Sequence, residues 1–351
     1  FCDHTSAYRG AGRVLSALPC AQHLPAKSEY PALKPDLIIH IGEVSGDYPT
    51  QGFLTNVAPV WRVSEDGEVR DRFKRLECVF EMTEEEFFRK AAAENGEGTG
   101  DYLRSWRAYD TRIRTAMPDL PFSNPWIARE LSVTLPHHAM LHFGILNSLR
   151  CWNYFEVDAS IETASNVGGF GIDGCVSTLI GASFVDPTRL HFGVIGDLAF
   201  FYDLNSLGNR HVGSNLRILL INNGGGGEFK LYSHIGSQFG DQTEDYIAAA
   251  GHYGNKSPDL ARHYAESLGF KYLFANNKEE FAAAVPEFIA PGPVDQPVLF
   301  ECFTDFADDS GALETLAHLD SSVSTDFAAR RLARKMIPVP VKSMIKNVLG
   351  K

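Results

Sequence analysis

The sequence lacks long apolar runs, paired cysteines and an excess of basic charge. No stretch of its 351 residues approaches the roughly 18 consecutive apolar residues that a membrane-spanning helix requires. Its six cysteines are scattered without a C-x-x-C pair, which predicts reduced thiols in a cytoplasmic protein and no zinc site. A net charge of −12 argues against general nucleic-acid binding. These absences agree with a soluble enzyme.

What the sequence does contain is enough apolar material for two cores. Hydrophobic residues make up 44% of the chain, and a length of 351 residues is typical of two domains. Strands are expected at 35–46, 60–64, 140–145, 271–275 and 297–303. Helices are expected at 83–95, 102–117 and 255–269, and Asn124-Pro125 is expected to supply the N-cap and first position of another. The alternation predicts an α/β fold.

Two apolar runs end in glycine and polar residues. Val194-Ile195 lead into Gly196-Asp197, and residues 218–221 lead into Asn222-Asn223 and four glycines. Such runs predict buried parallel strands whose carboxyl ends share one edge of the sheet, where ligands of α/β proteins bind. A carboxylate, an amide oxygen and glycine carbonyls are hard oxygen ligands that suit magnesium. The pattern therefore predicts a magnesium–diphosphate site, although an N-cap aspartate and a glycine-rich turn would also fit it.

A dinucleotide-binding site is the weaker alternative. Residues 169–174 satisfy G-x-G-x-x-G, follow a strand expected at 157–163 and precede a helical segment expected at 175–183. Asp197 lies near the position of a ribose-binding acid. This interpretation, a nicotinamide-dependent dehydrogenase, leaves Asn222-Asn223 and the glycines unexplained.

The spacing of the two runs resembles the cofactor motif of thiamine diphosphate enzymes, in which Gly-Asp-x is followed about two dozen residues later by Asn-Asn. Here 23 residues separate Leu198 from Asn222, and Leu198 replaces the commoner glycine. With the segment SNVGGFGIDGCVSTLIGAS at 165–183, the chain is similar to the menaquinone-pathway synthase branch of this family. The similarity covers most of the chain and is sharpest over about 145–230.

This resemblance implies a set of site residues. The metal would be held by the Asp197 carboxylate, the Asn223 side chain and the Gly225 carbonyl. The diphosphate would be lined by residues around the end of the first run: Gly196, Leu198 and Ala199.

Three more residues are candidates on the same grounds. Ile172 would lie beneath the thiazolium ring and bend the cofactor into its reactive shape. Asn147 and Ser148 fit the family pattern and could approach the cofactor or substrate. A helix beginning after the strand at 140–145 explains these two residues equally well.

The resemblance also implies the domain organisation. Enzymes of this type have pyrimidine-binding, central and diphosphate-binding domains, each a three-layer α/β/α structure with a mainly parallel sheet. We place a partial central domain and linker at 1–120, the diphosphate and metal domain at 121–310, and an extension with a basic tail at 311–351. The activating glutamate belongs to the pyrimidine-binding domain, so no catalytic residue is assigned here. The isolated chain is expected to be inactive, and the enzyme a homodimer or homotetramer.

The substrate is less defined. Val167 and Trp152 stand where the menaquinone branch has arginines, although Arg150 is close by. The expected activity is therefore a thiamine diphosphate- and magnesium-dependent 2-oxoacid decarboxylase or carboligase. A non-catalytic α/β binding protein with a relic diphosphate site remains the alternative. The tail at 326–351 has seven basic residues and one acid, which predicts packing on a subunit or disorder rather than binding to anionic membrane.

Overall fold

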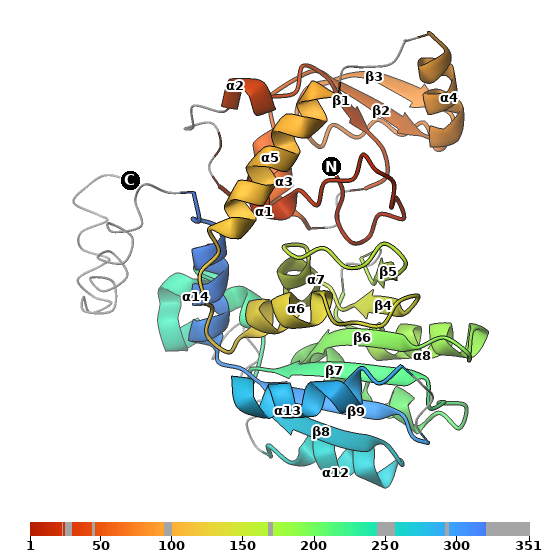
Figure 1. Cartoon of the computed structure of the whole chain (residues 1–351), viewed down its shortest axis with the longest axis vertical. Coiled ribbons are helices and arrows are strands. Elements are labelled where there is room, and N and C mark those ends of the chain that lie inside the picture. Colours follow the sequence, from red (N-terminus) through yellow and green to blue (C-terminus); the bar gives the residue numbers. More distant parts are fainter. Residues whose placement is uncertain are drawn as a thin grey trace, which may run out of the picture.

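A computed structural model describes residues 1–22, 24, 30–43, 46–94, 100–167, 171–243, 257–291 and 295–320. The described residues form two parallel sheets, with helices alternating between the strands (Figure 1). This confirms the predicted α/β class. No helix among these residues is long and apolar enough to cross a membrane. Residues 95–99, which lie in the range assigned to the central domain and linker, and the basic tail at 326–351 lie outside the described residues.

The first sheet has three strands in the order β1-β2-β3, all parallel. They are β1 (Ile38–His40), β2 (Val60–Ser64) and β3 (Leu76–Glu81). The helices of this part are α1 (Ala17–Cys20), α2 (Tyr30–Leu33), α3 (Tyr48–Leu54), α4 (Glu84–Glu94) and α5 (Asp101–Thr115). Helix α5 carries the chain from this part toward the second sheet (Figure 1).

The second sheet has six parallel strands in the order β5-β4-β6-β7-β9-β8. They are β4 (Met140–Phe143), β5 (Glu162–Ser165), β6 (His191–Gly196), β7 (Leu216–Asn222), β8 (Lys271–Ala275) and β9 (Val298–Phe303). The α-helices are α6 (Asn124–Ser132), α7 (Asn147–Trp152), α8 (Cys175–Val185), α9 (Asp197–Tyr202), α12 (Leu260–Ser267), α13 (Lys278–Phe288) and α14 (Phe306–Leu316). Short 3₁₀ turns are η2 (Leu204–Gly208), η3 (Gly227–Lys230) and η4 (Ile235–Gln242).

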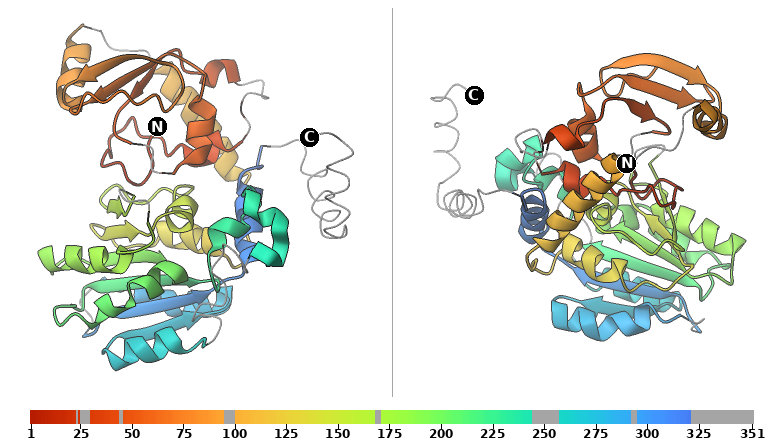
Figure 2. Two further views of the ribbon diagram at one scale, coloured as in Figure 1. Left: turned by 180° about the vertical axis from the view of Figure 1, so that it is seen from behind. Right: turned by 45° about the horizontal axis from the view of Figure 1, so that its top comes forward.

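Both faces of the second sheet are buried, as its apolar strands require. Alternate residues of β7 point to opposite faces, so Leu219 and Ile221 pack with α6 and α13 while Ile218 and Leu220 pack with α8 and α12. Figure 2 shows helices on both sides of this sheet. The result is the three-layer arrangement that the sequence predicted.

The first residues of the chain run between the two sheets (Figure 1) and are anchored by His4. The His4 ring is fully buried, and its Nε2 lies 3.1 Å from the Trp152 carbonyl oxygen and 2.9 Å from that of Phe155. Because both partners are acceptors, Nε2 carries the proton and donates. Its backbone N–H donates to the Asn153 side chain at 2.9 Å. The N-terminal segment is thereby fixed to the end of α7.

Three local expectations were wrong in detail. The strand expected at 157–163 begins only at Glu162, because the Asp158 carboxylate accepts hydrogen bonds from both the backbone and hydroxyl of Ser160 and forms a turn there. Helix α6 is capped by Ser123, whose hydroxyl accepts the Trp126 N–H at 3.3 Å; Asn124 is already inside the helix.

The third concerns the segment 35–46, expected to be a buried strand. The strand, expected to end in a glycine-rich turn, is Ile38–His40 among the described residues of this segment, but it is not fully buried, because Ile39 remains 38% exposed. Strand β3 was not predicted, because its sequence, Leu76–Glu81, mixes acidic and apolar residues. Helix α14 crosses the boundary that we placed at 310 and buries Leu313 and Leu316.

Burial of His4 predicts a stability that depends on pH. Burial lowers the pKa of His4 from 6.5 to about 4, so between these values the unfolded chain binds a proton that the folded chain does not. The free energy of unfolding should therefore fall as the pH drops, and His4 should contribute a loss of about 2 kcal/mol between about pH 7 and pH 5. Urea unfolding at the two pH values should show that His4→Gln removes this part of the loss.

The matched control is His263→Gln, which changes an exposed histidine on α12. That variant should lose as much stability on acidification as the unmodified chain. An equal loss in His4→Gln would contradict the assignment.

Candidate functional site

The two predicted runs meet at one edge of the second sheet. Strands β6 and β7 are parallel neighbours, with Gly196 paired to Ile221. Strand β6 leads directly into α9, which begins at Asp197, and β7 ends at Asn222 before the glycine-rich loop. Since Gly196 lies opposite Ile221, the next residues, Asp197 and Asn222, lie at the same level of the sheet, and the loop begins directly after Asn222.

Asp197 is a buried carboxylate, 3% exposed, that faces the glycine-rich loop. It accepts the Leu198 N–H at 2.8 Å, and the N–H groups of Gly224 and Gly225 also stabilise its charged form. Burial nevertheless raises the pKa of Asp197 from 3.8 to about 7. A carboxylate held this far from water is stabilised by a cation placed against it. The structure therefore brings Asp197 together with the loop that contains Gly225.

Asn223 presents an unused oxygen at the same edge. Its Nδ2 donates to the Asp309 carboxylate at 3.1 Å, which fixes the orientation of the amide. Its Oδ1 is buried and accepts no hydrogen bond from any described residue. An unpaired buried oxygen costs about 1–3 kcal/mol, so it calls for a partner such as a water or an ion.

Asp309 is a positioning residue that the sequence did not reveal. It lies on α14, is almost fully buried, and also accepts the Asn124 N–H at 2.7 Å and the Thr304 hydroxyl at 3.0 Å. These bonds hold the carboxylate where it can orient Asn223. Asp309 is 86 residues from Asn223, and no local pattern connects the two.

The side chain of Asn222, the residue before Asn223, makes its hydrogen bonds with groups other than those around the Asn223 oxygen. Its Nδ2 donates to Glu301 of β9 at 2.7 Å, and its Oδ1 accepts the Gly224 N–H at 3.2 Å. Burial raises the pKa of Glu301, which also accepts the Tyr272 hydroxyl at 2.8 Å. The two asparagines therefore differ: Asn222 supports the loop, and Asn223 offers a free oxygen.

The glycines of the loop permit close packing around Asn223. Gly224 has a positive φ of 85°, a conformation that favours glycine. A Cβ on Gly227 would lie 2.9 Å from Asn223 Nδ2 and 3.3 Å from Asn147 Nδ2. The Gly225 carbonyl accepts the Gly227 N–H at 3.0 Å and retains a second lone pair. A side chain at position 227 would therefore displace the Asn223 amide.

Asn147 and Ser148 begin helix α7, as the simpler interpretation predicted. The Asn147 oxygen accepts from Arg150 at 2.5 Å, and Arg150 forms an ion pair with Glu228 at 2.5 Å. Leu146, before the helix, has φ 60° and ψ −120°, a strained conformation for a residue with a side chain. Asn147 is thus fixed beside Gly227, and Glu228 is a second residue that the sequence did not reveal.

The positions that lack the expected arginines are apolar and packed. Trp152 is fully buried, with its ring 5.5 Å from that of Phe143. Val167 packs against the same core. Ile172 is half-buried against the cluster on the other face, just before α8; residues 168–170 lie outside the described residues. Arg150 does not supply the free positive charge that the missing arginines would provide, because it already forms an ion pair with Glu228.

The donor set fits magnesium rather than a softer metal. The described residues contain no group of three or more His, Cys, Asp or Glu side chains that could hold a metal ion. The edge offers instead one carboxylate (Asp197), one unpaired amide oxygen (Asn223) and backbone carbonyls. Magnesium binds such oxygens and uses a diphosphate to complete its coordination.

Comparison with known proteins agrees with this geometry. Residues 151–302 match the model of the thiamine pyrophosphate enzyme, C-terminal TPP binding domain. This range contains β6, β7 and the glycine-rich loop, and it also contains the G-x-G-x-x-G at 169–174. That motif therefore belongs to the same domain, and the dinucleotide interpretation is not supported.

Curated relatives extend the similarity beyond this domain. The 2-succinyl-5-enolpyruvyl-6-hydroxy-3-cyclohexene-1-carboxylate synthase of Bacteroides thetaiotaomicron is 34% identical over 288 residues, which are 82% of this chain and 50% of that protein. The protein of the same name from Phocaeicola vulgatus is 33% identical over 288 residues, with the same coverage. The chain thus spans half the length of these relatives. It belongs to the thiamine pyrophosphate enzyme family and carries that family's C-terminal cofactor-binding domain.

Proposed function

We propose that the chain carries the metal and diphosphate part of the active site of a magnesium-dependent enzyme that decarboxylates a 2-oxoacid or joins it to an acceptor. The observation that carries this proposal is the unpaired Asn223 oxygen, held at the same sheet edge as the buried Asp197. Asp197, Asn223 and the Gly225 carbonyl would hold the metal. Thiamine diphosphate, when bound, supplies the carbanion chemistry.

The residues of this chain would bind and orient rather than transfer protons. Gly196, Leu198 and Ala199 would line the diphosphate, since they surround Asp197 at the start of α9. Ile172 would support the thiazolium ring from the segment before α8. Asn147 would approach the cofactor or substrate from α7, with Ser148 buried behind it. No catalytic acid or base is assigned among them.

The substrate class follows from the side chains at positions 150, 152 and 167, where the menaquinone branch has arginines at 152 and 167. The relatives are named for a product that carries carboxylate groups. Trp152 is buried in the core, Val167 is partly buried against it, and Arg150 is neutralised by Glu228, so none of the three offers a free cation to a second carboxylate. A simple 2-oxoacid therefore fits better than a substrate with several carboxylates. We propose that the active form is a homodimer or homotetramer, which sedimentation would test.

The metal assignment predicts the effect of Asp197→Asn. This substitution keeps the shape and removes the charge, so magnesium-dependent binding of thiamine diphosphate should weaken by more than about 100-fold. Calorimetric titration with and without EDTA measures it, and Asp36→Asn, an exposed site in the first part of the chain, is the control. Unchanged affinity in Asp197→Asn would refute the assignment. Absence of any cofactor binding to the unmodified chain would favour a relic binding protein.

The role of Asp309 predicts a separate result. In Asp309→Asn the new amide can no longer act as a pure acceptor for Asn223, so magnesium-dependent binding of thiamine diphosphate should weaken by about 10- to 100-fold. Thr304→Val is the control, because it removes a hydrogen bond to the same carboxylate and leaves Asn223 in place.

Thermal unfolding of both variants separates folding from positioning. Similar losses of melting temperature with a loss of affinity only in Asp309→Asn are expected. Equal losses of affinity in the two variants would show that Asp309 has only a structural role.

A further inference from the structure

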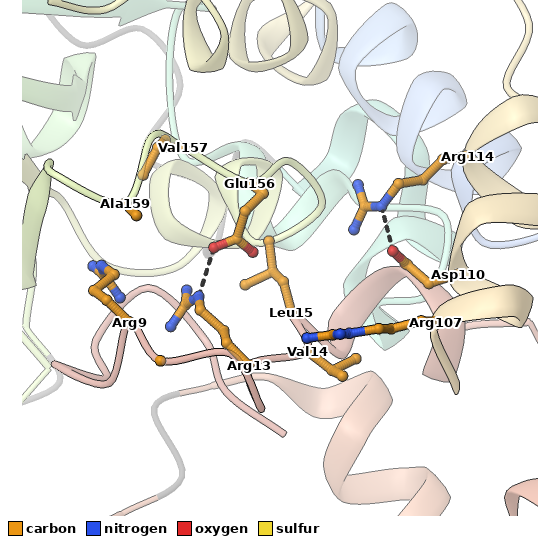
Figure 3. Close-up of a pocket in the computed structure, with 11 residues that line it drawn as sticks. Arg9, Arg13, Val14, Leu15, Arg107, Asp110, Arg114, Glu156, Val157 and Ala159 are labelled. Carbon is orange, nitrogen blue, oxygen red and sulfur yellow. Dashed lines mark hydrogen bonds and ion pairs between the residues drawn. The ribbon is translucent and has the colours of Figure 1, made fainter. Parts of the chain in front are cut away.

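A pocket of about 320 Å³ lies outside the proposed cofactor site. Three segments far apart in the sequence line it: the N-terminal segment around Arg9 to Leu15, helix α5, and the loop that follows α7. Figure 3 shows Arg9, Arg13 and Arg107 from the first two segments on one side and Glu156 from the third opposite them, with Arg114 near the level of Glu156. The loop precedes β5, whereas the candidate metal ligands follow the strands β6 and β7.

The walls of this pocket carry more positive than negative charge. Four arginines line it against two carboxylates: Arg9, Arg13, Arg107 and Arg114 against Asp110 and Glu156. Two of the arginines are neutralised, because Arg13 pairs with Glu156 at 2.5 Å and Arg114 with Asp110 at 2.7 Å (Figure 3). The remaining excess of positive charge in the pocket contrasts with the net charge of −12 of the whole chain.

Arg9 and Arg107 have no carboxylate partner among the described residues. Arg9 donates to neutral oxygens: the Ser6 carbonyl at 2.8 Å, the Tyr8 and Ile161 carbonyls at 3.3 Å each, and the Thr163 hydroxyl. Burial and the neighbouring Arg13 lower the pKa of Arg9, and the nearby carboxylates of Glu156 and Glu162 oppose this shift only in part. Arg107 is exposed and donates one hydrogen bond, to the Ala11 carbonyl, which leaves most of its five N–H groups for a ligand.

The rest of the lining is apolar. Val14, Leu15 and Val157 are buried residues whose side chains form part of the wall. The guanidinium of Arg107 can bind a carboxylate through paired hydrogen bonds, and Arg9 adds a positive charge to the wall. The apolar wall favours a carbon skeleton between the charges. We propose that this pocket binds a small organic dicarboxylate with an apolar body, held by Arg9 and Arg107.

The probe is isophthalate, an aromatic dicarboxylate, titrated by calorimetry into the full 351-residue chain without magnesium or thiamine diphosphate. Binding measured in this way does not depend on whether the proposed cofactor site is correct. Saturable binding is expected, weaker by at least about tenfold for benzoate, which offers only one charge. Arg107→Gln should weaken isophthalate binding by roughly tenfold, and Arg9→Gln should do the same.

The matched control is Arg112→Gln. Arg112 lies on the same helix, pairs with Asp320 and does not line the pocket, so its loss should leave the affinity within about twofold. Arg107→Gln is the decisive variant, because this exposed side chain has one hydrogen bond to lose and melting temperature will show that the fold is intact. No saturable binding of isophthalate, equal binding of benzoate, or equal effects of Arg107→Gln and Arg112→Gln would each overturn the proposal.

Discussion

The parallel pairing of β6 with β7 is the constraint on which the candidate site depends. It places Gly196 opposite Ile221, so that Asp197 emerges level with Asn222, the last residue of β7, and Asn223 follows directly. A shift of the register would move Asp197 away from the glycines that donate to it. Burial of both faces makes such a shift costly, because the alternating side chains of β7 fill two different cores. Core packing thereby fixes the geometry of the polar edge.

The sequence was informative where structure is local or where strands are fully buried. The runs before Asp197 and Asn223 are apolar on both faces, which identifies central parallel strands without further information. The first sheet was harder to predict, because β1 leaves Ile39 partly exposed and β3 contains acidic residues. The start of β5 and the cap of α6 depended on local side-chain hydrogen bonds, from Ser160 to Asp158 and from Trp126 to Ser123.

The residues of the candidate site also fall into two groups, those that the sequence predicted and those that only the structure reveals. Asp197, Asn223 and the glycines were predicted because each follows its strand directly. Asp309 and Glu228 could not be, since their roles arise from contacts across the fold: Asp309 orients Asn223 from α14, and Glu228 neutralises Arg150, which holds Asn147. Nothing in the spacing of these residues indicates that they meet. Residues that contact a ligand often follow a pattern, whereas residues that position them are found only from the structure.

The arrangement around Asn223 carries a cost that folding alone does not explain. Leaving its oxygen buried and unpaired sacrifices about 1–3 kcal/mol. The fold accepts this because Asp309 holds the amide nitrogen, and Asp309 is itself secured by the Asn124 N–H and the Thr304 hydroxyl. Reversing the amide would place its oxygen against a carboxylate, which is worse. The edge is therefore organised before any ion arrives: the free oxygen is aimed by a network that exists without the ligand, and the cost of orienting it falls on folding rather than on binding.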